Sequence, residues 1–226
     1  MKEQGLFKDK EGIKNTSNQL INLEELAQFI RKGSEEVLLF GGVSKDSTTP
    51  HKPNHKTCDY RETDSQRKTE KRICRCMYYN NLKEHKNKCN HCSYKCKWEL
   101  VNSDEYKILD YETPSSYVIE GVGGVDLLIQ SGTDKYAVEV KAKGSTETIV
   151  RMLAEILTYT TDIMYQDFTP AICFFEGSSQ YKQMEEIKNN TDLIEILSKK
   201  HIEVFYFSYE TEGAVNKFRI NRFDWK

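Results

Sequence analysis

The sequence has no apolar run that approaches the roughly 20 residues of a transmembrane helix, so we expect no membrane partner. The first residues, 1–5, are polar and charged and carry no secretory signal, so we expect a cytoplasmic protein in a reducing setting. In that setting seven cysteines are metal ligands or free thiols more often than disulfides. No internal repeat is present, and 226 residues suffice for one sizeable core, with or without a small added module.

Charge of neither sign dominates the whole chain, which has a net charge of −2, but the charges are unevenly distributed. Between His51 and Trp98 there are 13 lysines and arginines against 5 aspartates and glutamates, whereas the rest of the chain holds 20 against 30. A basic block of this kind is typical of nucleic-acid contact, and a solvated lysine-rich surface is the alternative. We therefore expect nucleic acid as a partner; the sequence leaves a monomer and a homodimer open.

Apolar periodicity is nearly absent from Ser44 to Cys96, where six of the seven cysteines lie. Their paired spacing is typical of a tetrahedral zinc site, because zinc is usually held by two short loops with two ligands each. The first choice of ligands is Cys74, Cys76, Cys89 and Cys92. Cys96 in place of Cys74 is the alternative set. We expect residues 44–98 to form a basic insert that is stabilised by zinc and assists substrate binding.

The remainder of the chain shows strand and helix patterns in alternation. Helical spacing predicts helices over residues 18–31, 147–163 and 180–199, the last broken near 189–190. Short apolar runs predict strands over residues 37–40, 106–109, 117–119, 124–129, 136–141, 171–175, 202–207 and 218–220. The pattern predicts an α/β core with helices against a mixed sheet, in which 1–43 supply the first helix and strand and 99–226 the rest.

Two of the expected strands carry charged residues among apolar ones. Glu139 and Lys141 are two residues apart and so project from the same face of their strand. The polar turn before that strand suits a hairpin, which would bring Asp126 alongside the pair. Inward-facing charges are costly unless they are paired or bind a metal, and carboxylate oxygens are ligands that Mg²⁺ prefers. The pattern therefore predicts a site for Mg²⁺ or Mn²⁺.

Gly124-Val125-Asp126, followed by Glu139-Val140-Lys141 and a helix, resembles the PD-(D/E)xK, or restriction-endonuclease-like, nuclease superfamily. The resemblance implies a restriction-endonuclease-like mixed central sheet flanked by helices. It also implies that Asp126, Glu139 and the backbone carbonyl of Val140 bind the metal, and that Lys141 assists the attacking water. Some nucleases of the superfamily carry iron–sulfur clusters, so the resemblance leaves an iron–sulfur centre as the alternative to zinc at the cysteines.

Three further points of the resemblance concern flanking residues. Glu155 and Tyr159 match the spacing of a Gln/Glu and Tyr pair that many members carry on the following helix, which makes Glu155 a fourth expected catalytic residue. The proline of the motif name is replaced by Val125. The acidic residue that the family carries on an early helix is not evident, and Glu25 is preferred to Glu24 and Glu120.

These observations predict a Mg²⁺-dependent nuclease, an endonuclease, that hydrolyses phosphodiester bonds in DNA with help from the zinc-stabilised module. A non-catalytic nucleic-acid-binding protein on the same scaffold is the alternative. A third class, a zinc module for protein interaction on an inert core, would have no affinity for nucleic acid.

Overall fold

The computed structural model describes residues 69–81, 97–114, 124–160, 165–189 and 191–225. The helix expected over 18–31 and the strands expected over 37–40 and 117–119 lie outside these residues. Within the described part of the chain, no helix is long and apolar enough to cross a membrane.

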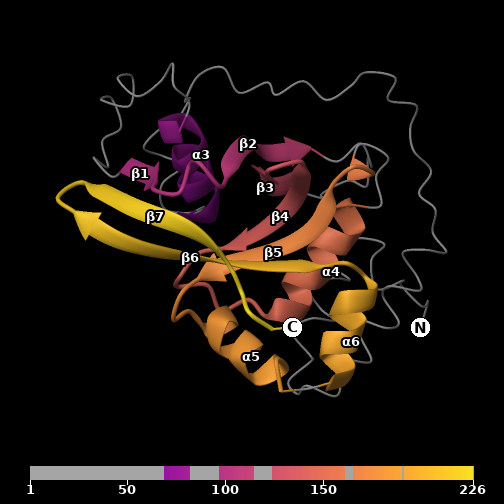
Figure 1. Ribbon diagram of the computed structural model, residues 1–226. Coiled ribbons are helices and arrows are strands. Elements are labelled where there is room, and N and C mark those ends of the chain that lie inside the picture. Colours follow the sequence, from indigo (N-terminus) through magenta and orange to yellow (C-terminus); the bar gives the residue numbers. More distant parts are fainter. Residues whose placement is uncertain (1–68, 82–96, 115–123, 161–164, 190, 226) are drawn as a thin grey trace, which may run out of the picture.

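In the segments that the structure describes, seven strands form one curled mixed sheet in the order β1-β7-β6-β5-β4-β3-β2 (Figure 1). Their bounds are β1 Lys97–Leu100, β2 Lys107–Pro114, β3 Gly124–Ser131, β4 Asp134–Lys141, β5 Thr169–Phe175, β6 Glu203–Glu212 and β7 Val215–Arg222. The central strands β4, β5 and β6 are parallel, whereas β2, β3 and β4 pair antiparallel, as do β6 and β7. The prediction of a mixed sheet with helices is confirmed.

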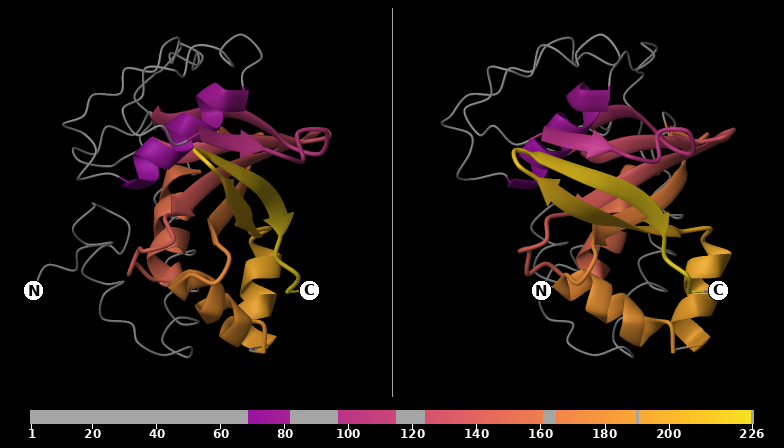
Figure 2. Two further views of the ribbon diagram at one scale, coloured as in Figure 1. Left: turned by 90° about the vertical axis from the view of Figure 1, so that its left-hand side faces the viewer. Right: turned by 60° about the vertical axis from the view of Figure 1, so that its left-hand side comes forward.

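The described helices cover both faces of this sheet. Their bounds are α3 Thr69–Asn81, α4 Ile149–Tyr159, α5 Ser179–Ile187 and α6 Thr191–Lys199. Figure 2 shows α3 on one side of the sheet and α4 to α6 on the other. The expected helix over 180–199 is found as the two helices α5 and α6, which are separated at 188–190 as the pattern predicted.

Each face of the sheet contributes to its own apolar cluster. Val138 and Val140 of β4 pack on the α3 side, whereas Ala137 packs on the α4 side. By the alternation of a strand, Glu139 and Lys141 project on the α4 side. The strand β4 is therefore buried on both faces, which explains why its apolar positions form a nearly continuous run.

The hairpin of β3 and β4 sets the position of the charged residues. Ser131 pairs with Asp134 and Leu127 with Val138, so only Gly132 and Thr133 form the turn. Gly132 has a φ of 58°, in the left-handed region that favours glycine. This short turn fixes the register and brings the start of β3 next to the end of β4.

The helix α3 and the strand β1 differ from the sequence prediction. The boundaries 44–98 place α3 and the first two residues of β1 in a metal-stabilised insert with little apolar content. In the structure Ile73 and Met77 of α3, and Trp98 of β1, are buried in the cluster on one face of the sheet. Helical spacing of four residues joins Ile73 and Met77, but Arg75 and the two cysteines between them obscured this stripe in the sequence.

Candidate active site

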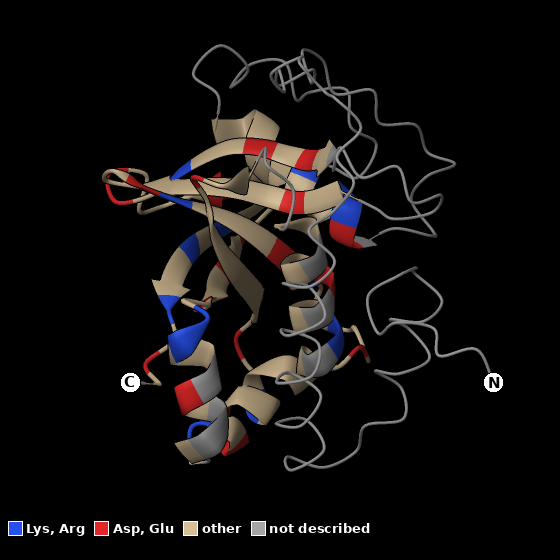
Figure 3. Ribbon diagram, turned by 90° about the vertical axis from the view of Figure 1, so that its right-hand side faces the viewer, with Lys and Arg blue, Asp and Glu red and all other residues tan. Residues whose placement is uncertain are grey.

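The structure brings together three of the predicted site residues. Asp126 lies near the start of β3, and its Oδ2 accepts a hydrogen bond of 2.8 Å from the backbone N–H of Val140. Glu139 and Lys141 lie at the end of β4, where Oε1 of Glu139 is 2.6 Å from Nζ of Lys141. All three side chains are buried. Figure 3 shows acidic residues of the strands next to one end of α4.

The helix α4 contributes the fourth predicted residue. It begins after Thr148, whose hydroxyl caps the helix by accepting a hydrogen bond from the N–H of Arg151. Oε2 of Glu155 lies 3.3 Å from Nζ of Lys141. Tyr159 is buried one turn later. Its burial, and to a smaller extent the charge of nearby Glu139, raises the pKa of its phenol. The phenol therefore stays protonated at neutral pH and can act as a hydrogen-bond donor.

Glu70 is a site residue that the sequence analysis missed. It lies in the first turn of α3, and one of its carboxylate oxygens is within 4.8 Å of one from Asp126 and one from Glu139. We call these three residues the carboxylate cluster. The sequence analysis looked for an early-helix acid and preferred Glu25, which lies outside the described residues. The signal for Glu70 was its place at the start of the stripe formed by Ile73 and Met77.

Burial and mutual repulsion disfavour ionisation of the carboxylate cluster. Burial raises the pKa of Asp126 to about 6 and, together with the charge of Asp126, raises that of Glu70 to about 7. The pKa of Glu139 is raised well above its ordinary value for the same two reasons. Without a bound cation, the cluster therefore retains protons near neutral pH.

The surroundings favour the charged form of Lys141, whereas they disfavour the charged forms of the carboxylate cluster. Burial alone would lower its pKa, but Glu139 and Glu155 raise it above its ordinary value, so the side chain is an ammonium ion. Burial likewise opposes the charge of Glu155, but Lys141 holds the pKa of this carboxyl below its ordinary value. Glu155 and Lys141 thus form a stable ion pair beside the cluster.

The donor set of the cluster fits Mg²⁺ or Mn²⁺. Hard divalent ions prefer carboxylate oxygens, and here three carboxylates from three elements converge within 4.8 Å. A cation would relieve the repulsion that now raises their pKa values. The carbonyl of Val140 lies between Glu139 and Lys141 in the chain, and its role as a ligand stays a prediction.

The cysteines are placed differently from what the first-choice zinc set requires. Cys74 is 0% exposed within the α3-side cluster, and burial raises the pKa of its thiol well above the ordinary value. Zinc binds the thiolate, so this environment disfavours Cys74 as a ligand. Residues two apart on a helix also point in nearly opposite directions, so Cys74 and Cys76 cannot share one ion from a regular α3. Cys89, Cys92 and Cys96 lie outside the described residues.

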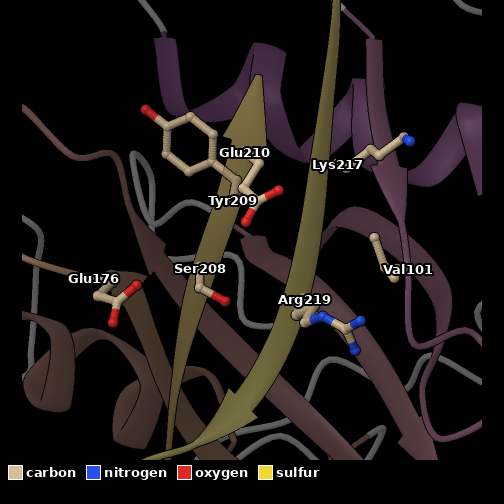
Figure 4. A pocket seen from close by; sticks show the side chains of 7 residues that line it. All are labelled: Val101, Glu176, Ser208, Tyr209, Glu210, Lys217 and Arg219. Atoms are coloured by element: carbon tan, nitrogen blue, oxygen red, sulfur yellow. The ribbon is translucent and has the colours of Figure 1, made fainter. Parts of the chain in front are cut away.

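A polar hollow of about 280 Å³ lies apart from the cluster, on the hairpin of β6 and β7 (Figure 4). Its lining residues are Val101, Glu176, Ser208, Tyr209, Glu210, Lys217 and Arg219. Ser208 is opposite Arg219 and Glu210 is opposite Lys217 in the strand register. Two carboxylates balance two cations in this hollow, so its charge favours neither an anion nor a cation.

The raised pKa values predict how stability depends on pH without added metal. Glu70 binds its proton more tightly in the folded state, where its pKa is about 7, than at its ordinary value of 4.5. Its contribution to the free energy of unfolding therefore falls as pH rises between these values. We expect urea unfolding to show a steeper loss of stability from pH 5.5 to 8 in the wild type than in Glu70→Gln. Added Mg²⁺ should reduce the wild-type loss, and equal slopes in the two proteins would contradict this.

Comparison of the chain with protein-family models, with curated proteins and with solved structures finds no match.

Proposed function

We propose that the protein is a Mg²⁺-dependent nuclease that hydrolyses phosphodiester bonds in DNA, acting as an endonuclease. The observation that carries the proposal is the convergence of Glu70, Asp126 and Glu139 within 4.8 Å, with the ammonium of Lys141 beside them. Buried carboxylates that repel one another destabilise the fold unless nearby cations compensate their charge. Their arrangement suits a divalent cation next to an anionic substrate.

Glu70, Asp126 and Glu139 would hold the metal. A bound Mg²⁺ would offset the charge that develops on a phosphate and lower the pKa of a nearby water. Lys141 remains protonated, because Glu139 and Glu155 raise its pKa. A protonated amine cannot accept a proton, so we assign Lys141 to stabilising negative charge on the phosphate rather than to general base catalysis.

Glu155 positions this ammonium. Its Oε2 is 3.3 Å from Nζ of Lys141, and its Oε1 accepts a hydrogen bond of 3.1 Å from Nε of Arg151. The carboxylate is thus held by cations from two elements, Lys141 of β4 and Arg151 one turn earlier on α4. Its fixed position favours one direction for the Lys141 side chain.

The basic block between His51 and Trp98 supports nucleic acid as the substrate, because lysine and arginine neutralise phosphates regardless of sequence. We include in the proposal a structural zinc ion held by cysteines of residues 44–98. The set of Cys76, Cys89, Cys92 and Cys96 is now preferred, since Cys74 is buried in the core. Elemental analysis of the purified protein distinguishes zinc from iron.

The test incubates the purified protein with labelled single- and double-stranded DNA and RNA, with Mg²⁺, with Mn²⁺, and without added divalent metal. We expect metal-dependent cleavage of internal bonds in DNA. Binding without cleavage under every condition would favour the alternative, a non-catalytic nucleic-acid-binding protein, which the basic block also supports. Neither binding nor cleavage would overturn both proposals.

A further inference from the structure

Glu147 is a carboxylate near the site to which the proposed chemistry gives no role. It lies just before α4 and bridges two cations. Its Oε2 is 3.0 Å from Nζ of Lys141, and its Oε1 is 2.8 Å from Nη1 of Arg151. The side chain of Glu147 is 31% exposed, against 5% for Lys141 and 14% for Arg151. Glu147 therefore covers the two cations from the solvent side.

Neither cation depends on Glu147 for a partner. Lys141 is already paired with Glu139 at 2.6 Å and with Glu155 at 3.3 Å. Arg151 is paired with Glu155 at 3.1 Å. A further carboxylate adds negative charge to a region that already has more acidic than basic groups. Stability of the site does not explain its position.

We propose that Lys141 and Arg151 together bind a phosphate of the substrate strand, and that the carboxylate of Glu147 occupies this place in the free protein. The inference rests on the proposed function, which it deepens by naming the phosphate-binding residues. Two oxygens of a phosphate can replace the two carboxylate oxygens of Glu147, since both groups are anions that present a pair of acceptor oxygens to hydrogen-bond donors. Arginine and lysine are the side chains that most often bind phosphate, and arginine does so with directional hydrogen bonds.

The backbone around Glu147 is held in place, so the exchange needs only a side-chain rotation. Nε2 of Gln180, on α5, donates to the carbonyl oxygens of Ser145 at 3.2 Å and of Glu147 at 2.5 Å. The N–H of Ile149 donates to Oε1 of Gln183 at 3.0 Å. The side chain of Glu147 can thus leave towards solvent while its main chain stays bound to α5.

The test measures binding of a fluorescent double-stranded DNA of fixed length, with Mg²⁺ present, in an Asp126→Asn background that slows cleavage on the order of 10³-fold. We expect Glu147→Gln to bind roughly 5-fold more tightly, because the phosphate no longer competes with a charged group. Glu185→Gln is the matched control. It removes the same charge from an exposed position on α5, where Glu185 pairs with Lys188, and its affinity should stay unchanged.

Arg151→Gln tests whether the gain in affinity of Glu147→Gln comes from a phosphate bound by Arg151 or only from the loss of one negative charge. We expect it to weaken binding and to abolish most of the gain from Glu147→Gln when the two are combined. An equal gain with and without Arg151 would overturn the proposal, as would a Glu147→Gln affinity equal to that of Glu185→Gln. Thermal unfolding of each variant verifies that it is folded, and Glu147→Ala should repeat the gain of Glu147→Gln.

The outcomes distinguish this inference from the proposed function. Wild-type protein that cleaves DNA, together with a Glu147→Gln variant that binds no more tightly, would reject the phosphate site alone. Tighter binding by Glu147→Gln without any wild-type cleavage would reject the nuclease and keep the phosphate site. Absence of DNA binding by every variant would reject both.

Discussion

Asp126→Asn should lower the rate of DNA cleavage on the order of 10³-fold. This is the typical effect of removing a group on which stabilisation of the transition-state charge depends. The substitution leaves the shape of the side chain nearly unchanged. The amide oxygen can still accept the hydrogen bond from the N–H of Val140, so the hairpin should keep its geometry. What is lost is the negative charge that would bind the metal together with Glu70 and Glu139. Cleavage rates at saturating DNA, measured over a range of Mg²⁺ concentrations, test this expectation.

Asp134→Asn is the matched control for this experiment. Asp134 lies on the same hairpin and is exposed, and its Oδ2 accepts a hydrogen bond of 3.4 Å from the hydroxyl of Tyr136. We expect its cleavage rate to equal that of the wild type. If Asp126→Asn cleaves as fast as Asp134→Asn, Asp126 does not hold a catalytic metal and the assignment of the site is wrong.

Lys141→Met should lower the free energy of unfolding by about 3–5 kcal/mol at pH 8, because it leaves buried carboxylates without their counter-charge. Glu139 loses the cation at 2.6 Å, and Glu155 loses the one at 3.3 Å but keeps Arg151 at 3.1 Å. The loss should be smaller at pH 5.5, where protonation removes much of the uncompensated charge. Urea unfolding at the two pH values measures both effects, and added Mg²⁺ should restore part of the stability at pH 8.

Lys199→Met provides the control for charge removal away from the site. Lys199 pairs with Glu195 on α6, and both side chains are largely exposed. Surface pairs of this kind contribute little, so we expect a change within about 0.5 kcal/mol at either pH. A Lys141→Met loss that is equally small, or that does not vary with pH, would contradict the electrostatic account of the site.

Local patterns were sufficient to predict much of the sheet. The strands β3 to β6 and the helix α4 follow from alternation and helical spacing that lie within short segments. The pairing of Asp126 with Glu139 and Lys141 followed from a short hairpin and the parity of one strand. The division of residues 180–199 into two helices followed from Asn189 and Asn190.

Non-local features were not predictable in the same way. The strand β1 pairs in parallel with β7, more than a hundred residues later, and nothing in its four residues indicates that partner. Glu70 reaches the site only because α3 packs on the sheet, whereas basic residues and cysteines around it favoured a separate zinc module. The contact of Glu147 with Arg151 has ordinary helical spacing, which the sequence shows. That Glu147 also contacts Lys141, from another element, is visible only in the structure.

The two-residue turn at Gly132 and Thr133 sets the register of β3 and β4, and this register decides both whether the core is apolar and whether the charged residues meet. A slip of one residue between β3 and β4 would turn Glu139 and Lys141 towards the α3-side core and would present Val138 and Val140 to Asp126 and Glu70 instead. Such a chain would bury charge among apolar side chains and could not persist as a compact molecule. Molecules with the wrong register of β3 and β4 therefore unfold. Every molecule that stays folded should have Asp126, Glu139 and Lys141 side by side.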